Sequence, residues 1–118
     1  MNEVGIDIEE VNRFKRLLII KPELVKKIFT QYEWEYASQK NTAQSLAGIW
    51  CAKEAVVKAL SALNLDIAIT DVFIGHQKNG VPIVLKINNV NIDSQKIKLS
   101  ISHTKVNAIA IAIFEKDI

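Results

Sequence analysis

The sequence contains a single cysteine, Cys51, so no disulfide can form within the chain. A chain without disulfides is typical of reducing compartments, and we expect a cytoplasmic protein. The longest apolar run, residues 108–114, is far too short to cross a bilayer as a helix. The first residues do not pair a basic segment with an apolar one, so we expect no secretory signal. These absences predict a soluble protein without a membrane partner.

Glycine, proline and excess charge are also scarce. There are 4 glycines and 2 prolines, with no repeat, no low-complexity tract and no flexible linker. The formal net charge of +2 is well short of that of a typical nucleic-acid-binding protein, so we expect no such partner. A chain of 118 residues, 49% of them hydrophobic, is large enough to bury a core. We therefore expect one domain over residues 1–118.

Local patterns place helices in the first half of the chain and strands mainly in the second. Thr30 and Glu33 form a capping box, which predicts that a helix begins there, and Asn79-Gly80 is a common turn signal between strands. We expect strands near residues 4–9, 71–77, 82–87, 97–102 and 107–115, and helices near residues 11–18, 22–29, 30–37 and 43–63. The predicted class is α+β, with an antiparallel sheet packed against a long helix and shorter helices. Residues 107–115 are apolar on both faces, as a central strand would be.

The stretch WCAKEAVVKAL, residues 50–60, places three charged residues on the long helix. At 100° per residue, Lys53 falls in the middle of a broad apolar face, while Glu54 and Lys58 share its flank. One interpretation is a Glu-to-Lys pair that stabilises the helix by a few tenths of a kcal/mol, with Lys53 extending its stem to water. The other is that Glu54 holds a metal and Lys58 an anion, as phosphoryl chemistry needs. Spacing alone leaves both open.

A metal at Glu54 needs a second carboxylate, and Asp7 is the candidate. It follows a strand-forming segment, and Gly5 leaves room near its backbone. The alternative is that Asp7 only caps the helix that follows. If Asp7 and Glu54 met at ~4 Å without a cation, their repulsion would be roughly 4 kcal/mol at an effective dielectric near 20. A magnesium ion would reverse that sign.

Five sequence blocks, in this order, resemble one known family. They are GIDIEEVNRF (5–14), FTQYE (29–33), WCAKEAVVKA (50–59), NGVP (79–82) and LSISHTKVNAIAIA (99–112), and the third fits the pattern W-x-x-K-E-A-x-x-K at every specified position. Nearly the whole chain is similar to the bacterial holo-acyl-carrier-protein synthases, the small type of 4'-phosphopantetheinyl transferase. The resemblance implies that family's fold and an enzyme of fatty acid biosynthesis. Such enzymes transfer the phosphopantetheine arm of coenzyme A to a serine of apo acyl carrier protein, releasing adenosine 3',5'-bisphosphate.

The resemblance also implies roles for individual residues. Asp7 and Glu54 would bind magnesium, which grips the diphosphate of coenzyme A, and Glu54 would take the serine proton directly or through a water. Lys58 would contact the diphosphate and stabilise or protonate the leaving phosphate. The implied coenzyme A-binding residues are Lys53, Lys58, Gly80, Pro82, Ser102, His103 and Thr104. As an isolated histidine, His103 would more often be a packed or exposed residue, and we expect His76 at the surface without a role.

The early helices carry many basic residues, and acyl carrier proteins are acidic. Arg13 matches the arginine of the family's first motif, so Arg13 and Arg16 are the expected carrier-protein contacts. The alternative is an ordinary solvated surface. The family also forms homotrimers with shared sites. Alternating Ala and Ile at residues 108–113 leaves no polar face on that strand, which favours cover by a neighbouring subunit, although a monomer whose helices suffice is the alternative.

Three departures from the family pattern concern the nucleotide end of coenzyme A. Ile49 and Val81 stand where the family commonly has arginine and lysine, and residues 61–64 replace a glycine-rich segment. One rival hypothesis is a non-catalytic carrier-protein-binding module with the same fold. The other is a cysteine hydrolase that uses Cys51 with His103.

Overall fold

A computed structural model describes residues 1–116, which form an α+β fold and so confirm the predicted class. The predicted strands, the helix cap at Thr30 and the turn at Asn79-Gly80 lie close to their predicted positions, with ends that shift by only a few residues. The elements are β1 (Asn2–Glu10), α1 (Val11–Ile20), α2 (Pro22–Ile28), α3 (Gln31–Ser38), α4 (Thr42–Ser61), β2 (Val72–His76), β3 (Pro82–Ile87), β4 (Ile97–His103) and β5 (Asn107–Glu115).

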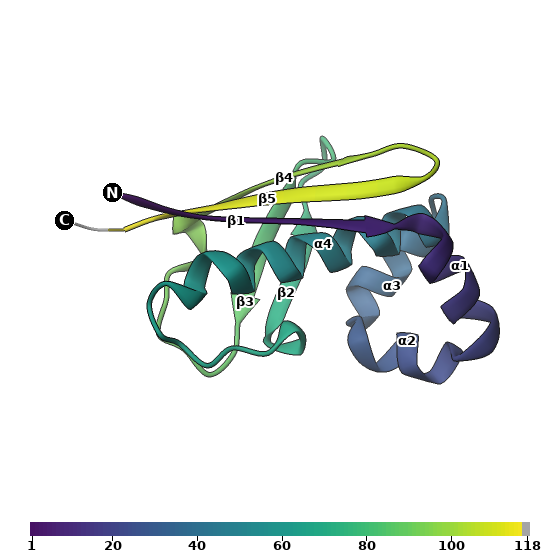
Figure 1. The fold of residues 1–118 in the computed structure, drawn as a ribbon, viewed down its shortest axis with the longest axis horizontal. Coiled ribbons are helices and arrows are strands. Elements are labelled where there is room, and N and C mark those ends of the chain that lie inside the picture. Colours follow the sequence, from purple (N-terminus) through teal and green to yellow (C-terminus); the bar gives the residue numbers. More distant parts are fainter. Residues whose placement is uncertain (117–118) are drawn as a thin grey trace.

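Two antiparallel sheets lie against the long helix α4. The larger has the strand order β1-β5-β4, and the smaller pairs β2 with β3. Figure 1 shows the larger sheet running along α4, with α1, α2 and α3 grouped at one end of the molecule. The prediction that residues 107–115 form a central strand is confirmed, because β5 pairs with β1 on one side and β4 on the other. Among residues 1–116, no helix is both long and apolar enough to cross a membrane.

The side chains on the two faces of β5 differ in size rather than in polarity. Ala108, Ala110 and Ala112 are buried against α4, whereas the isoleucines between them face away from it. On β1 the exposed residues Val4, Ile6 and Ile8 are likewise aliphatic, and they pair across the strands with the isoleucines of β5. We call this surface the outer sheet face; it consists of Val4, Ile6, Ile8, Ile109, Ile111 and Ile113.

A buried ion pair joins three elements, α3, α4 and β2. Glu33 caps α3 as predicted, since its Oε1 accepts a hydrogen bond from Thr30 N at 2.9 Å and Thr30 Oγ1 accepts one from Glu33 N at 3.1 Å. The same carboxylate lies 2.8 Å from Lys53 Nζ and accepts a second backbone N–H, from Ile74. Lys53 Nζ also donates to the Val72 carbonyl at 2.7 Å. The pair therefore fixes α3, α4 and β2 relative to one another.

The expectation that Lys53 extends to water is wrong. Both Lys53 and Glu33 have side chains that are 0% exposed. Burial lowers the pKa of Lys53, and the neighbouring Glu33 carboxylate opposes that shift. Sequence reasoning put Lys53 correctly on the apolar face of α4 but had no signal for its partner, because Glu33 lies on a different helix.

Candidate functional site

Asp7, Glu54 and Lys58 come together where β1 packs on α4, and we call this group the carboxylate site. The close approach of the two elements depends on Gly5, two residues before Asp7 on the same face of β1. A Cβ at Gly5 would lie 2.6 Å from Ala59 N and would overlap the carbonyl oxygen of Ala55. Those two residues directly follow Lys58 and Glu54 on α4. The absence of a side chain at Gly5 thus brings the Asp7 carboxylate onto the charged flank of the helix.

Lys58 reaches across to β1. Its Nζ donates to the Ile6 carbonyl at 3.0 Å and lies 3.2 Å from Asp7 Oδ1. The Lys58 side chain is 53% exposed, whereas that of Asp7 is only 15% exposed. The sequence pattern suggested a pair between Glu54 and Lys58, but the ion pair that Lys58 makes here is with Asp7. The ammonium group is therefore held beside the carboxylates while it still faces solvent.

The surroundings of Glu54 raise the pKa of its carboxyl group. Partial burial raises the pKa of its carboxyl, and the neighbouring Asp7 charge raises it further, while Lys58 and Arg13 act in the opposite direction. Two carboxylates thus repel each other across the site, as expected if Asp7 and Glu54 lie close together. A raised pKa makes Glu54 a better proton acceptor at neutral pH than an ordinary glutamate.

Sequence reasoning missed Glu9, which lies at the edge of the carboxylate site. Glu9 Oε2 lies 2.6 Å from Arg13 Nη1, and the Glu9 charge also raises the pKa of Glu54. The signal was available, because Gly5, Asp7 and Glu9 occupy alternate positions of one strand and so share a face. Arg13 lies over the ring of Trp50 on α4, 5.6 Å from its centroid. Arg13 therefore adjoins the carboxylate site as well as the α1 surface.

Cys51 does not support the cysteine hydrolase hypothesis. It is 0% exposed, and its Sγ lies 3.5 Å from the Ala108 carbonyl oxygen. Burial raises the pKa of the thiol, and the nearby Asp7 carboxylate raises it further. A reactive cysteine needs a lowered pKa and access to substrate. His103, the proposed base, is exposed, so the two side chains lie in different environments.

The donor set of the carboxylate site fits magnesium. This ion typically takes one or two protein carboxylates and fills its other positions with water and substrate phosphate oxygens. Asp7 and Glu54 provide two carboxylates whose mutual repulsion a cation would relieve. Within residues 1–116 no cluster of three or more His, Cys, Asp or Glu side chains suited to a metal is found. The site therefore fits a cation held jointly with a phosphate-bearing substrate rather than a closed structural metal site.

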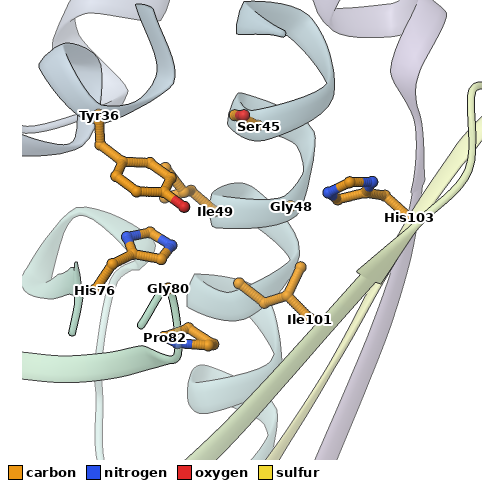
Figure 2. A pocket seen from close by; sticks show the side chains of 9 residues that line it. All are labelled: Tyr36, Ser45, Gly48, Ile49, His76, Gly80, Pro82, Ile101 and His103. Carbon is orange, nitrogen blue, oxygen red and sulfur yellow. The ribbon is translucent and has the colours of Figure 1, made fainter. Parts of the chain in front are cut away.

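A second site is a pocket between α3, α4, β3 and β4, with a volume of about 120 Å³. Figure 2 shows Tyr36 and His76 along one side, Ile101 and His103 across from them, and α4 between. Gly80 and Pro82, from the turn between β2 and β3, close another side. The structure thus brings together three of the residues implied for coenzyme A binding: Gly80, Pro82 and His103.

Other implied coenzyme A ligands do not line this pocket. Ser102 lies on the opposite side of β4, beside Ile6 and Ile109. Thr104 lies in the turn after β4, where its Oγ1 accepts hydrogen bonds from Val106 N and Asn107 N. The Lys53 side chain is fully buried and paired with Glu33, so we do not retain it as a coenzyme A ligand.

The expectation that His76 is a surface residue is also wrong. Its ring stacks on Tyr36, with centroids 3.6 Å apart and planes 3° apart. The ring is partly buried, and it lines the pocket. No local pattern predicts this stack, since Tyr36 and His76 come from elements separated by the whole of α4.

On α1, Arg13 and Arg16 line a shallow groove together with Leu17, Ile20 and Lys21. Ile20 is 70% exposed, so the groove combines cationic and apolar groups on an open surface. Such a combination suits an acidic protein partner with an apolar contact, because rim charges steer association and buried apolar area holds the complex.

The sequence and the fold both match proteins of known activity. A family model described as the 4'-phosphopantetheinyl transferase superfamily matches residues 3–113. The holo-[acyl-carrier-protein] synthase of Caldicellulosiruptor bescii is 40% identical over 119 residues, covering 96% of this chain and 97% of that protein.

Two solved structures show the same fold. The complex of an acyl carrier protein synthase with coenzyme A from Chronobacterium ammoniagenes aligns with a TM-score of 0.82 and 22% identity, covering 98% of this chain and 99% of that one. A holo-(acyl-carrier-protein) synthase from Bacillus anthracis, in complex with CoA (3',5'-ADP), aligns with a TM-score of 0.76 and 28% identity, covering 98% and 96%.

Proposed function

The chain belongs to the 4'-phosphopantetheinyl transferase superfamily and acts as a holo-[acyl-carrier-protein] synthase, and we propose that Asp7, Glu54 and Lys58 carry its chemistry. The enzyme transfers the 4'-phosphopantetheine arm of coenzyme A to a serine of apo acyl carrier protein. The observation that carries the proposal is the meeting of two carboxylates and a half-exposed ammonium at the Gly5 contact between β1 and α4.

In the reaction, the serine oxygen bonds to the phosphorus that bears pantetheine, and the bond from that phosphorus to the bridging oxygen breaks. Glu54 accepts the serine proton, a role supported by its raised pKa. Lys58 stabilises the charge that develops on the departing adenosine 3',5'-bisphosphate, or protonates it. Its exposure and its anchoring to Ile6 and Asp7 hold the ammonium at the site without enclosing it. Positioning and charge stabilisation supply most of the catalysis in such a transfer.

Asp7 and Glu54 are the residues that would hold magnesium. When bound, the ion supplies Lewis-acid neutralisation of the diphosphate charge. Asp7 is oriented for this role by its ion pair with Lys58 and by the packing of β1 on α4. The pocket lined by Gly80, Pro82 and His103 takes the nucleotide end of coenzyme A. A cytoplasmic location stays a prediction from the sequence.

The direct test is mass spectrometry of an apo acyl carrier protein incubated with this protein, coenzyme A and magnesium. Addition of the phosphopantetheine arm to the carrier serine is the expected result. Tight carrier binding without any added mass would instead favour the non-catalytic binding module.

Lys58→Ala is expected to lower turnover by about 10²–10³-fold, the usual loss when one group that stabilises transition-state charge is removed. Coenzyme A binding should weaken much less, because the ammonium matters most as charge builds on the leaving phosphate. Steady-state kinetics with coenzyme A as the varied substrate measures both. The matched control is Lys86→Ala, which also removes one cation but lies on the other sheet, over the ring of Phe73, and should leave turnover unchanged. A changed Michaelis constant at unchanged turnover would refute this role for Lys58.

The groove on α1 is the proposed docking surface for the acidic carrier protein. Arg13 and Arg16 provide its charge, and Ile20 its exposed apolar contact. The association rate should therefore fall as ionic strength rises.

A homotrimer is the proposed assembly, with the outer sheet face covered by neighbouring subunits. Val4, Ile6 and Ile8 are 57%, 53% and 62% exposed in the single chain. These residues and the isoleucines of β5 form one continuous aliphatic surface, and contiguous exposed patches of this kind usually mark interaction sites.

Light scattering at micromolar concentration should give three times the mass of one chain. Ile111→Glu, at the centre of the outer sheet face, should shift the protein to a single chain because it buries a charge at the interface. Leu24→Glu is the control, since Leu24 is an exposed apolar residue on α2, outside that face. Full activity in a species of one-chain mass would exclude the trimer.

A further inference from the structure

The pocket of Figure 2 differs from the carboxylate site in the chemistry of its walls. Among the described residues that line it, none is Lys, Arg, Asp or Glu; its polar side chains are Tyr36, Ser45, His76 and His103. Ile49 and Pro82 add apolar surface. A phosphate group needs cationic or multiple N–H partners, whereas a neutral planar ring needs flat walls and one or two hydrogen bonds. The only neutral planar ring of coenzyme A is its adenine, so this pocket suits the base rather than the phosphates.

The Tyr36–His76 stack gives the pocket one rigid wall. The two rings lie face to face, 3.6 Å apart, and the His76 carbonyl also accepts a hydrogen bond from Tyr32 Oη at 3.4 Å. The stack restricts rotation of the imidazole, and the hydrogen bond holds the backbone from which the ring projects. Figure 2 shows the ring of His76 lying beneath that of Tyr36, with its edge turned into the pocket.

The protonation of His76 follows from its surroundings. Burial, and secondarily the charge of Lys40, lower the pKa of the imidazole below its ordinary value of 6.5, so the ring is neutral at neutral pH. Nδ1 is enclosed and has no hydrogen-bond partner among residues 1–116. A proton there would be a buried, unpaired donor, which is costly. The neutral ring therefore carries its proton on Nε2, the nitrogen that can meet a ligand.

We propose that His76 is a specificity-determining residue that recognises the nucleobase of coenzyme A, with its Nε2–H donating to a ring nitrogen of adenine. The inference rests on the proposed function, because it takes the substrate to be coenzyme A. Adenine offers N1, N3 and N7 as acceptors. With no fixed cation at the pocket wall, the base contact supplies selectivity that a charged residue would otherwise supply.

Two variants separate the hydrogen bond from the stack. His76→Phe keeps a flat ring against Tyr36 but removes the donor, whereas His76→Gln keeps an N–H near the position of Nε2. Calorimetry with adenosine 3',5'-bisphosphate and the Michaelis constant for coenzyme A are the two readouts. His76→Phe should weaken both by about three- to tenfold at unchanged turnover, the effect of one hydrogen bond. His76→Gln should recover most of that loss.

Coenzyme A analogues in which carbon replaces N1, N3 or N7 of adenine identify the contact. One of these analogues should bind the wild-type protein about three- to tenfold more weakly than coenzyme A does, the same loss as that expected for His76→Phe. The His76→Phe protein should bind that analogue and coenzyme A equally well. Wild-type affinity of His76→Phe for the bisphosphate would overturn the proposal, as would an equal loss with that analogue in both proteins. Failure of the proposed function has a different signature: apo carrier protein then stays unmodified by the wild-type enzyme, and the calorimetric comparison still decides the role of His76.

Discussion

Asp7→Ala and Glu54→Ala are each expected to reduce phosphopantetheine transfer by about a thousandfold or more. Each removes one of the two oxygen ligands proposed for magnesium, and Lewis-acid stabilisation at such a site contributes several kcal/mol, at about 1.4 kcal/mol per tenfold in rate. Glu54→Ala also removes the proposed proton acceptor. The carrier-modification assay measures the rate over a range of magnesium concentrations, and calorimetry measures magnesium-dependent coenzyme A binding.

Folding should be little affected, because neither side chain belongs to the apolar core. Glu3→Ala is the matched control: Glu3 lies on the same face of β1 as Asp7, but its ion pair is with Lys116, away from α4. It should retain wild-type transfer. Near-normal rates for both Asp7→Ala and Glu54→Ala at saturating magnesium would contradict the assignment of the metal site.

Lys53→Met should lower the free energy of unfolding by about 3–5 kcal/mol, the usual effect of removing one partner of a buried ion pair. The substitution keeps a long side chain but leaves the Glu33 carboxylate without its cation, at a position with no access to water. It also removes the donor to the Val72 carbonyl. Chemical denaturation measures the change, and a lowered denaturation midpoint at unchanged slope is the expected form.

The double variant Glu33→Gln with Lys53→Met tests the cause. It removes the unpaired charge while leaving an amide oxygen that can accept a backbone N–H, so it should be more stable than Lys53→Met alone. Equal stability of the two would show that the buried charge is not the cause. If Lys53→Met instead kept wild-type stability and raised the Michaelis constant for coenzyme A, Lys53 would return to the coenzyme A ligands.

Most of the fold was predictable because its signals are local. The capping box at Thr30, the Asn79-Gly80 turn and the doubly apolar strand β5 each depend on neighbouring residues, and all lie as predicted. Gly80 adopts a φ of +88°, the left-handed conformation for which that turn needs glycine. The strand order β1-β5-β4 depends on contacts between distant segments, which periodicity does not encode.

The candidate site was predictable in part for the same reason. Spacing along α4 put Glu54 and Lys58 on one flank, but only the meeting of β1 with α4 pairs Lys58 with Asp7. The partner of Lys53 and the stacking of His76 on Tyr36 were missed, because both depend on side chains from separate elements. Ser102, His103 and Thr104 are consecutive in the sequence, yet their side chains lie in different places. Alternation along β4 puts Ser102 and His103 on opposite sides of the strand, and Thr104 lies in the turn that follows.

The central position of β5 has a consequence for the kinetics of folding. Its register against β1 pairs Asn2 with Glu115 and Ile8 with Ile109, so these contacts close a loop of nearly the whole described chain. Loops of that length are entropically costly to close, and folds rich in such non-local pairings form slowly. Local structure in α4 and in the β2-β3 hairpin can form before the larger sheet does. We therefore expect the rate-limiting step to be the docking of the β4-β5 hairpin onto β1, so that substitutions at Ala110 slow folding more than equally destabilising ones in α2.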